Sequence, residues 1–242
     1  MKIIEEAIDL LFPPSCIGCG QLNTWLCEKC KNLLLIDAVP ECAVCRKVSN
    51  RYLTHPGCST GFPLDKVVIC WRYNKLAKKI MSLFKYKYRY RICSELVEMA
   101  KNKILPYIDW DSILVPVPSN TKNIKERGFS QTMLICKEIS QMTGCNIVNL
   151  LHKQSLENQA QLTRTDRLKL TVKKFRVDRT LAKNIKGRRI VIVDDVCTTG
   201  STSRACAKLL VKFRPATISA IALFRGRKGH YLNHLPTTST TT

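Results

Sequence analysis

Cysteine is the residue type in this 242-residue chain whose spacing points most directly to chemistry. Four cysteines form two Cys-x-x-Cys pairs joined by a short loop, an arrangement that suits a tetrahedral zinc ion. They are Cys16, Cys19, Cys27 and Cys30. A second set repeats the pattern with an imidazole in place of one thiolate, and its members are Cys42, Cys45, His55 and Cys58. Because protein groups would fill every ligand position, we expect one or two structural zinc ions rather than a catalytic one.

A second candidate site is the run of acidic and hydroxyl residues that follows the apolar residues 190–193. Asp194 and Asp195 come first, where an α/β sheet places its ligands, and their carboxylates suit sugar hydroxyls or a bound Mg²⁺. The next residues lead into a helix, where Gly200 permits unusual backbone angles and the helix dipole attracts a phosphate monoester. They are Val196, Cys197, Thr198, Thr199, Gly200, Ser201 and Thr202. The alternative interpretation is an ordinary turn followed by a helix N-cap.

Short β-branched runs alternate with helical segments from about residue 66 onward, and these are the elements that must position both sites. The predicted strands are 67–71, 113–117, 146–151, 189–193 and 217–223. The predicted helices are 76–84, 93–105, 129–142 and 203–213. This alternation predicts an α/β fold with a mainly parallel sheet flanked by helices. The remaining cysteines read as small buried apolar residues, namely Cys70, Cys93, Cys136, Cys145 and Cys206.

The chain divides by composition into three parts. Residues 1–62 comprise a short lead-in helix and the cysteine-rich segment, which has too little apolar periodicity to fold without a metal staple. Residues 63–230 form the α/β domain, and we expect the polar tail 231–242 to be disordered. The N-terminus mixes acidic and apolar residues unlike a signal peptide, and no apolar run is long enough to span a bilayer. We therefore expect a cytoplasmic protein.

The charge balance predicts a polyanionic partner. Lys and Arg number 40 against 18 Asp and Glu, which gives a formal net charge of +22. Nucleic acid is the first candidate, and an anionic membrane surface or a merely solvated basic surface are the alternatives.

One stretch concentrates this charge, because no acidic residue occurs between Asp65 and Glu95 while cations alternate with aromatic rings. Such a mixture holds single-stranded nucleic acid, since cations follow the phosphates and rings stack on bases. The cations are Arg72, Lys75, Lys78, Lys79, Lys85, Lys87, Arg89 and Arg91. If residues 85–91 were extended, the cations would share one side and the rings the other. The alternative is a core helix whose lysines are simply solvated.

The twelve residues 191–202 resemble the signature of type I phosphoribosyltransferases. Further blocks follow the same order as in the ComF family of late-competence proteins: Leu-Val-Pro-Val-Pro at 114–118, Arg-Gly-Phe-Ser-Gln at 127–131 and Gln-Ala-Gln-Leu at 159–162 with Arg167. Together with the cysteine pairs, the chain resembles that family over about residues 9–225. Two positions depart from the family pattern, His55 in place of a cysteine and Ser130 in place of an asparagine.

This resemblance implies a phosphoribosyltransferase-like domain behind a double zinc ribbon. It further implies that Asp194 and Asp195 hold the ribose of phosphoribosyl pyrophosphate (PRPP) and that residues 198–202 hold its 5′-phosphate. Arg127 lies between a predicted strand and a helix, and its forked guanidinium could meet the pyrophosphate from the opposite rim.

Three functions remain open. The first is a protein of natural transformation that binds single-stranded DNA and a phosphoribosyl ligand, with possible contacts to the DNA-uptake machinery of the inner membrane. The second is an active PRPP-dependent phosphoribosyltransferase that uses Mg²⁺. The third is a zinc-ribbon adaptor that contacts other proteins. A fold alone does not choose among them.

Overall fold

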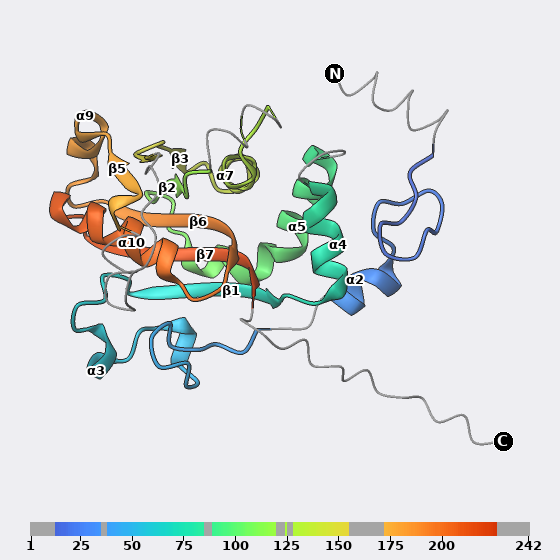
Figure 1. Cartoon of the computed structure of the whole chain (residues 1–242), viewed down its shortest axis with the longest axis horizontal. Coiled ribbons are helices and arrows are strands. Elements are labelled where there is room, and N and C mark those ends of the chain that lie inside the picture. Colours follow the sequence, from blue (N-terminus) through green and yellow to red (C-terminus); the bar gives the residue numbers. More distant parts are fainter. Residues whose placement is uncertain are drawn as a thin grey trace, which may run out of the picture.

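Five parallel strands form the central sheet of the computed structural model, in the order β1-β7-β6-β2-β3 (Figure 1). The structure describes residues 13–34, 38–84, 89–119, 124, 128–154 and 172–226. The strands of this sheet are β1 (Lys66–Arg72), β2 (Ile113–Pro116), β3 (Asn146–Ile147), β6 (Arg189–Cys197) and β7 (Thr217–Arg225). A parallel sheet flanked by helices confirms the predicted fold class.

The helices and the smaller elements lie around this sheet. The α-helices are α2 (Glu28–Leu34), α3 (Pro56–Ser59), α4 (Lys75–Phe84), α5 (Arg89–Ile104), α7 (Gln131–Thr143), α9 (Arg179–Ala182) and α10 (Ser201–Leu210). The 3₁₀ turns are η1 (Asn50–Tyr52), η2 (Leu105–Tyr107), η3 (Lys183–Ile185) and η4 (Val211–Phe213). A two-stranded antiparallel ribbon pairs β4 (Leu151–Lys153) with β5 (Phe175–Val177). No helix within the described ranges is long and apolar enough to cross a membrane.

Alternation along the strands divides the interior into two cores. In β1, Val68 and Cys70 point to the face covered by α4, α5 and α7, whereas Val67 and Ile69 point to the face covered by α10. Side chains alternate because successive residues of a strand project to opposite faces. Figure 1 shows these helices on the two sides of the sheet.

Local sequence explains where the main helices begin and end. The Asn74 side chain accepts a hydrogen bond of 2.8 Å from the Ala77 amide at the start of α4. Ser130 accepts from the Met133 amide at the start of α7, and Gly144 ends that helix with a φ of 74°. Asn and Ser are preferred at the N-cap of a helix, and glycine is preferred at its C-terminal end. The helices therefore begin and end close to the positions that their spacing predicts.

One predicted strand is wrong. The predicted strand 146–151 is two strands, because the Leu150 amide bonds the Val148 carbonyl at 2.9 Å and turns the chain between β3 and β4. Arg89 and Arg91 lie in the first turn of α5, so the arrangement considered for an extended 85–91 segment does not apply to them. The predicted lead-in helix, residues 159–162 with Arg167, and the tail 231–242 lie outside the described residues.

Candidate functional sites

The first cysteine cluster brings together the four predicted sulfur atoms. The ligand atoms of Cys16, Cys19, Cys27 and Cys30 all lie within 4.8 Å of one another. Cys19 Sγ and Cys27 Sγ are 3.6 Å apart, close to the separation of about 3.8 Å that tetrahedral Zn–S bonds of about 2.3 Å impose. No disulfide joins any of the four. Their number, chemistry and spacing fit a closed structural zinc site.

This cluster is seated on the core beside α4. Leu34, at the end of α2, is fully buried. The side-chain amide of Asn74 donates to the Leu33 carbonyl at 2.8 Å, and Lys79 Nζ donates to the Gly18 carbonyl at 3.3 Å. The first cluster therefore forms part of the packing of α4 and α5 rather than a separate appendage.

The second cluster brings the predicted imidazole together with three thiols. The ligand atoms of Cys42, Cys45, His55 and Cys58 also lie within 4.8 Å of one another, and Cys45 Sγ is 3.3 Å from His55 Nδ1. His55 Nε2 donates to the Val48 carbonyl at 3.2 Å, because a carbonyl can only accept. That bond leaves the Nδ1 lone pair free for a metal, as outer-shell partners of ligating histidines commonly do. The cluster therefore fits a Cys3His zinc site.

Backbone amides prepare one sulfur in each cluster for a metal. Burial raises the pKa of Cys16, but backbone amides, first that of Cys27, lower the pKa to about 6. Burial likewise raises the pKa of Cys42, but hydrogen bonds from backbone amides, first that of Cys45, lower this pKa to about 6. Burial and the neighbouring thiols raise the pKa of Cys30 to about 12 and that of Cys58 to about 11. The four thiols of the first cluster and the three of the second cannot all ionise without a compensating positive charge, so both clusters fit a divalent cation.

The acidic pair lies at the carboxyl end of β6, inside the sheet rather than after it. Asp194 is 8% exposed, and its Oδ1 accepts the Asp195 amide at 3.0 Å. Burial, and then the neighbouring Asp195 carboxylate, raise the pKa of Asp194 well above its ordinary value. Asp195 is half-buried. The pair therefore offers one enclosed and one accessible carboxyl, which is suited to hydroxyl groups.

The loop after the acidic pair has the geometry of an anion site. Gly200 adopts a φ of 72° and occupies the N-cap of α10 without a side chain to cap the helix. The Ser201 amide donates to Thr199 Oγ1 at 3.4 Å, and the helix dipole favours negative charge at this end of α10. Thr198 and Thr199 are exposed, and Thr199 Oγ1 donates to Ser201 Oγ at 3.0 Å. Thr202 lies half-buried in the first turn of α10.

A contact that the sequence did not reveal joins the second cluster to this loop. Arg46, directly after Cys45, donates from Nη2 to the Thr198 carbonyl at 3.0 Å. Arg225 at the end of β7 donates from Nη1 to Cys197 Sγ at 3.3 Å. Glu41 Oε2 lies 3.8 Å from Arg46 Nη1 and 3.7 Å from Arg225 Nη2. The only sequence signal was the position of Arg46 next to a metal ligand.

The predicted nucleic-acid cations are only partly described. Arg72 ends β1, and Lys75, Lys78 and Lys79 are exposed on α4. Arg91 is half-buried in α5, and the side chain of Arg89 lies outside the described set. Lys85, Lys87 and Arg127 also lie outside the described residues.

The smaller predictions about buried cysteines are confirmed. The five cysteines predicted to be buried apolar residues are each at most 1% exposed. Cys197, at the end of β6, is also buried, and burial raises the pKa of its thiol. These six sulfur atoms therefore belong to the cores and not to a third metal cluster among the described residues.

Comparison with known proteins finds one matching family model and several similar proteins. The family model described as "Phosphoribosyl transferase domain" matches residues 133–237. The competence protein ComFC of Bacillus subtilis is 27% identical over 64% of this chain and 62% of its own length. Competence protein F of Haemophilus influenzae is 28% identical over 87% of this chain and 96% of its own length. A solved structure of the allosteric regulatory enzyme of purine biosynthesis is 18% identical, covers 58% of this chain and 29% of its own, and has a TM-score of 0.39.

A parallel α/β sheet with an acidic strand end, a glycine N-cap and two metal clusters defines a phosphoribosyltransferase-type domain with zinc modules. The matching motifs and relatives make the likeness more specific: the chain is similar to competence proteins of the ComF family.

Proposed function

We propose that this protein handles single-stranded DNA during DNA uptake and binds a phosphoribosyl ligand such as PRPP at residues 194–202. The cytoplasm is its place of action, where DNA arrives from the uptake machinery of the inner membrane. The names of its ComF relatives, which are competence proteins, support the assignment to natural transformation.

One observation carries the link between DNA and the ligand site: the cationic stretch begins at the same edge of the sheet as the phosphate loop. Arg72 of β1 pairs in register with Arg225 of β7, and Arg225 pairs with Cys197 of β6. Two strand spacings separate Arg72 from Cys197, a distance of roughly 10 Å. A strand of DNA that follows Arg72 and the exposed lysines of α4 would therefore pass beside the ligand pocket.

The pocket itself is suited to a sugar phosphate. The amides and hydroxyls at the start of α10 would hold the 5′-phosphate, and the carboxyls of Asp194 and Asp195 would hold the ribose hydroxyls. Arg127 is proposed to meet the pyrophosphate. Mg²⁺, when bound, would neutralise pyrophosphate oxygens, and Asp195 is the more accessible carboxylate toward it.

The test is a fluorescence titration of a labelled single-stranded oligonucleotide at several salt concentrations, with and without PRPP and Mg²⁺. Asp194→Asn and Asp195→Asn serve as pocket variants, because they keep the side-chain size. The triple variant Lys75→Gln/Lys78→Gln/Lys79→Gln serves as the DNA variant. We expect DNA affinity to fall steeply with salt, and the triple variant to lose about three units of the salt slope. PRPP binding should be lost only in the aspartate variants.

Salt-insensitive or absent DNA binding would contradict the proposal and favour the adaptor interpretation. DNA binding that persists in the triple variant with an unchanged salt slope would move the DNA site away from α4. DNA binding that is lost together with PRPP binding in the aspartate variants would place both ligands in one pocket.

Phosphoribosyl transfer is the second candidate function, and the intact pair of Asp194 and Asp195 favours it. In that reaction an acceptor nucleophile attacks the ribose C1, while the C1–O bond breaks and pyrophosphate leaves with the electron pair. The two carboxyls would stabilise the positive charge that develops on the ribose. Release of pyrophosphate from PRPP that depends on an added base and disappears in Asp195→Asn would establish transfer; PRPP binding without release would exclude it for the bases tried.

A further inference from the structure

The contact between Arg46 and Thr198 places a metal-cluster residue on the ligand loop. The Arg46 guanidinium donates to the Thr198 carbonyl at 3.0 Å across 152 residues of sequence. Arg46 has a left-handed φ of 65°, and its amide donates to the Cys42 carbonyl at 3.0 Å. The direction of its side chain is therefore set by the turn that holds two metal ligands.

A second contact ties the same module to the helix that follows the loop. Arg204 of α10 donates from Nη2 to the Gly61 carbonyl at 3.2 Å, and its guanidinium lies 5.2 Å from the centre of the Phe62 ring. Glu41, one residue before Cys42, lies between the guanidinium groups of Arg46 and Arg225. The loop and the start of α10 are thus held from one side by residues that flank the second cluster.

We propose that Arg46 is a positioning residue that couples metal occupancy of the second cluster to the conformation of the phosphate loop. With zinc bound, the turn at residues 42–45 is fixed and Arg46 holds the Thr198 carbonyl. Without zinc, the turn is no longer fixed by metal–ligand bonds, and the loop loses the hydrogen bond from Arg46. The coupling rests on the proposed function only for the identity of the ligand, which we take to be PRPP.

Reciprocity follows from thermodynamic linkage. If zinc at the second cluster strengthens ligand binding by a given factor, the ligand strengthens zinc binding by the same factor. Coupling between two sites commonly amounts to about 5- to 150-fold, and we expect a value in this range for the affinity of PRPP.

Hydrogen exchange of the loop tests the coupling without any ligand. In the full-length protein, amides 198–203 should exchange faster in Arg46→Ala and in Cys45→Ser than in the wild type. The double variant should show no further increase, because both changes remove the same link. Lys47→Ala is the matched control, since it removes a neighbouring exposed cation, and it should leave the loop unchanged. Arg46→Lys, which keeps a donor, should restore part of the protection.

PRPP affinity and zinc release supply the second readout. PRPP should slow the release of one zinc to a chromophoric chelator in the wild type but not in Arg46→Ala. Unchanged loop exchange in both Arg46→Ala and Cys45→Ser would overturn the coupling even if PRPP binds. Failure of the zinc-loaded wild type to bind PRPP would instead overturn the proposed ligand, while the exchange data still decide the coupling.

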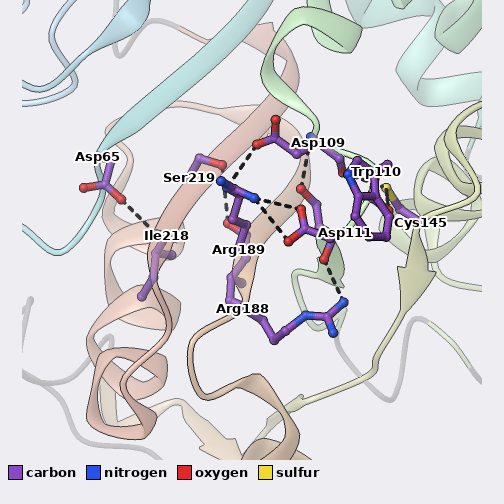
Figure 2. Close-up of polar contacts among 11 residues, drawn as sticks. Asp65, Asp109, Trp110, Asp111, Cys145, Arg188, Arg189, Ile218 and Ser219 are labelled. Carbon is purple, nitrogen blue, oxygen red and sulfur yellow. Dashed lines mark hydrogen bonds and ion pairs between the residues drawn. The ribbon is translucent and has the colours of Figure 1, made fainter.

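A separate observation concerns Trp110, at the opposite edge of the sheet. Its side chain is 86% exposed on the turn between η2 and β2. The turn is fixed, because the Ser112 amide donates to the Asp109 carbonyl at 2.9 Å and Cys145 Sγ donates to the same oxygen at 3.2 Å. Figure 2 shows Arg189 between Asp109 and Asp111, with its Nη1 3.0 Å from Asp111 Oδ1 and its Nε 3.3 Å from Asp109 Oδ2.

Cations adjoin this turn. Arg188 Nη2 donates to the Asp111 carbonyl at 2.9 Å. The Gly187 amide bonds the Arg214 carbonyl at 2.9 Å, so the exposed residues Lys186, Arg188 and Arg214 lie on neighbouring segments. Arg189 bonds both carboxylates and offsets one of their two negative charges. With Lys186, Arg188 and Arg214 added, the cations around the turn still outnumber the acids.

We infer that Trp110 is a stacking platform for a base of single-stranded DNA, with Lys186, Arg188 and Arg214 beside the adjoining phosphates. Rigid exposed rings next to cations bind single strands by this chemistry. The inference deepens the proposed function by adding a second contact, at the edge opposite the phosphate loop.

Intrinsic fluorescence gives a direct test, since the chain has three tryptophans and Trp71 is fully buried while Trp25 is half-buried. An unlabelled oligothymidine should quench the emission of the wild type and not that of Trp110→Phe. Trp110→Ala should weaken DNA binding by about 5- to 100-fold, and Trp110→Phe by much less. Leu22→Ala, which removes another exposed apolar side chain, is the control. DNA binding that is unchanged in Trp110→Ala would overturn this contact alone; absence of DNA binding in the wild type would overturn the proposed function as well.

Discussion

The two metal clusters have nearly the same ligand spacing but different surroundings. In the first cluster, Cys16, Cys27 and Cys30 are buried in the core shared with α4 and α5. In the second cluster only Cys42 is buried, and Cys45 is exposed. The first cluster is therefore part of the main core, whereas the second lies at the surface and contacts the phosphate loop through Arg46. Two clusters with similar motifs can thus have different roles, one in stabilising the core and the other in supporting the ligand site. The difference arises because their ligands are buried to different extents and contact different residues.

The largest expected difference between the clusters is in stability. Cys30→Ser should remove one zinc and destabilise the fold by roughly 4 kcal/mol or more, because the lost metal belongs to the main core. Cys58→Ser should also remove one zinc but cost only about 1–2 kcal/mol. Urea unfolding together with zinc analysis measures both quantities. Equal losses of stability would show that the clusters are equivalent.

Glycine substitutions sharpen the comparison, because each cluster has a glycine directly before one of its cysteines. Gly18 precedes Cys19 in the first cluster, and Gly57 precedes Cys58 in the second. A Cβ at position 18 would collide with the Cys30 side chain and come within 3.3 Å of Leu76 Cδ1. A Cβ at position 57 meets nothing within 4 Å. Gly18→Ala should therefore destabilise the fold by about 1–3 kcal/mol, and Gly57→Ala by less than about 0.5 kcal/mol. Thermal unfolding distinguishes them, and a larger effect at Gly57 would contradict the structure.

His55 tests the second cluster by itself. His55→Ala removes the Nδ1 ligand, so we expect loss of one zinc and a decrease in stability of about 1 kcal/mol. His55→Cys supplies a sulfur ligand at the same position and should retain two zinc ions. Zinc content measured by atomic spectrometry decides the matter; two zinc ions in His55→Ala would show that the imidazole is not a ligand.

The smallest expected effect concerns the ion pairs beside each cluster. Lys31 Nζ lies 3.0 Å from Glu95 Oε1, and hydrogen bonds from Lys31 to Glu28 and then Glu95 raise the pKa of Lys31 above its ordinary value of 10.5. Glu95→Gln should reduce stability by about 0.5 kcal/mol.

The sign of the pH dependence follows from that raised pKa. The contribution of Lys31 to the free energy of unfolding is fully present below the pKa that Lys31 has in the unfolded chain. It is lost as the pH rises through the higher pKa that Lys31 has in the folded protein. On the alkaline side, the stability difference between the wild type and Glu95→Gln should thus persist to about pH 10.5 and vanish above it, as urea unfolding at several pH values can show. Glu41→Gln beside the second cluster should show no such window, because its partners are arginines that stay protonated. A difference that disappears near neutral pH would contradict the assignment.

Local features of the fold were predictable because they depend on residues near one another in sequence. Metal-ligand spacing identified both clusters, and alternation of β-branched and helical segments identified the sheet and its main helices. Strand 146–151 was mispredicted, because the amide of Leu150 turns back to Val148, a contact that apolar periodicity does not encode. Whether residues 89–91 are extended or helical was left open by the sequence, because alternating charges and rings fit a strand as well as a helix end; the structure places Arg89 and Arg91 in α5.

The sequence by itself determined the types of chemistry: soft ligands in two sets, a strand end with two carboxyls, a glycine at a helix start, and an excess of positive charge. Only the tertiary structure decided which of these meet. It brings Arg46 to Thr198, buries the first cluster in a core while the second lies at the surface, and leaves Trp110 exposed. Such contacts join residues far apart in the chain, and they follow from how the strands order within the sheet, which no local spacing records.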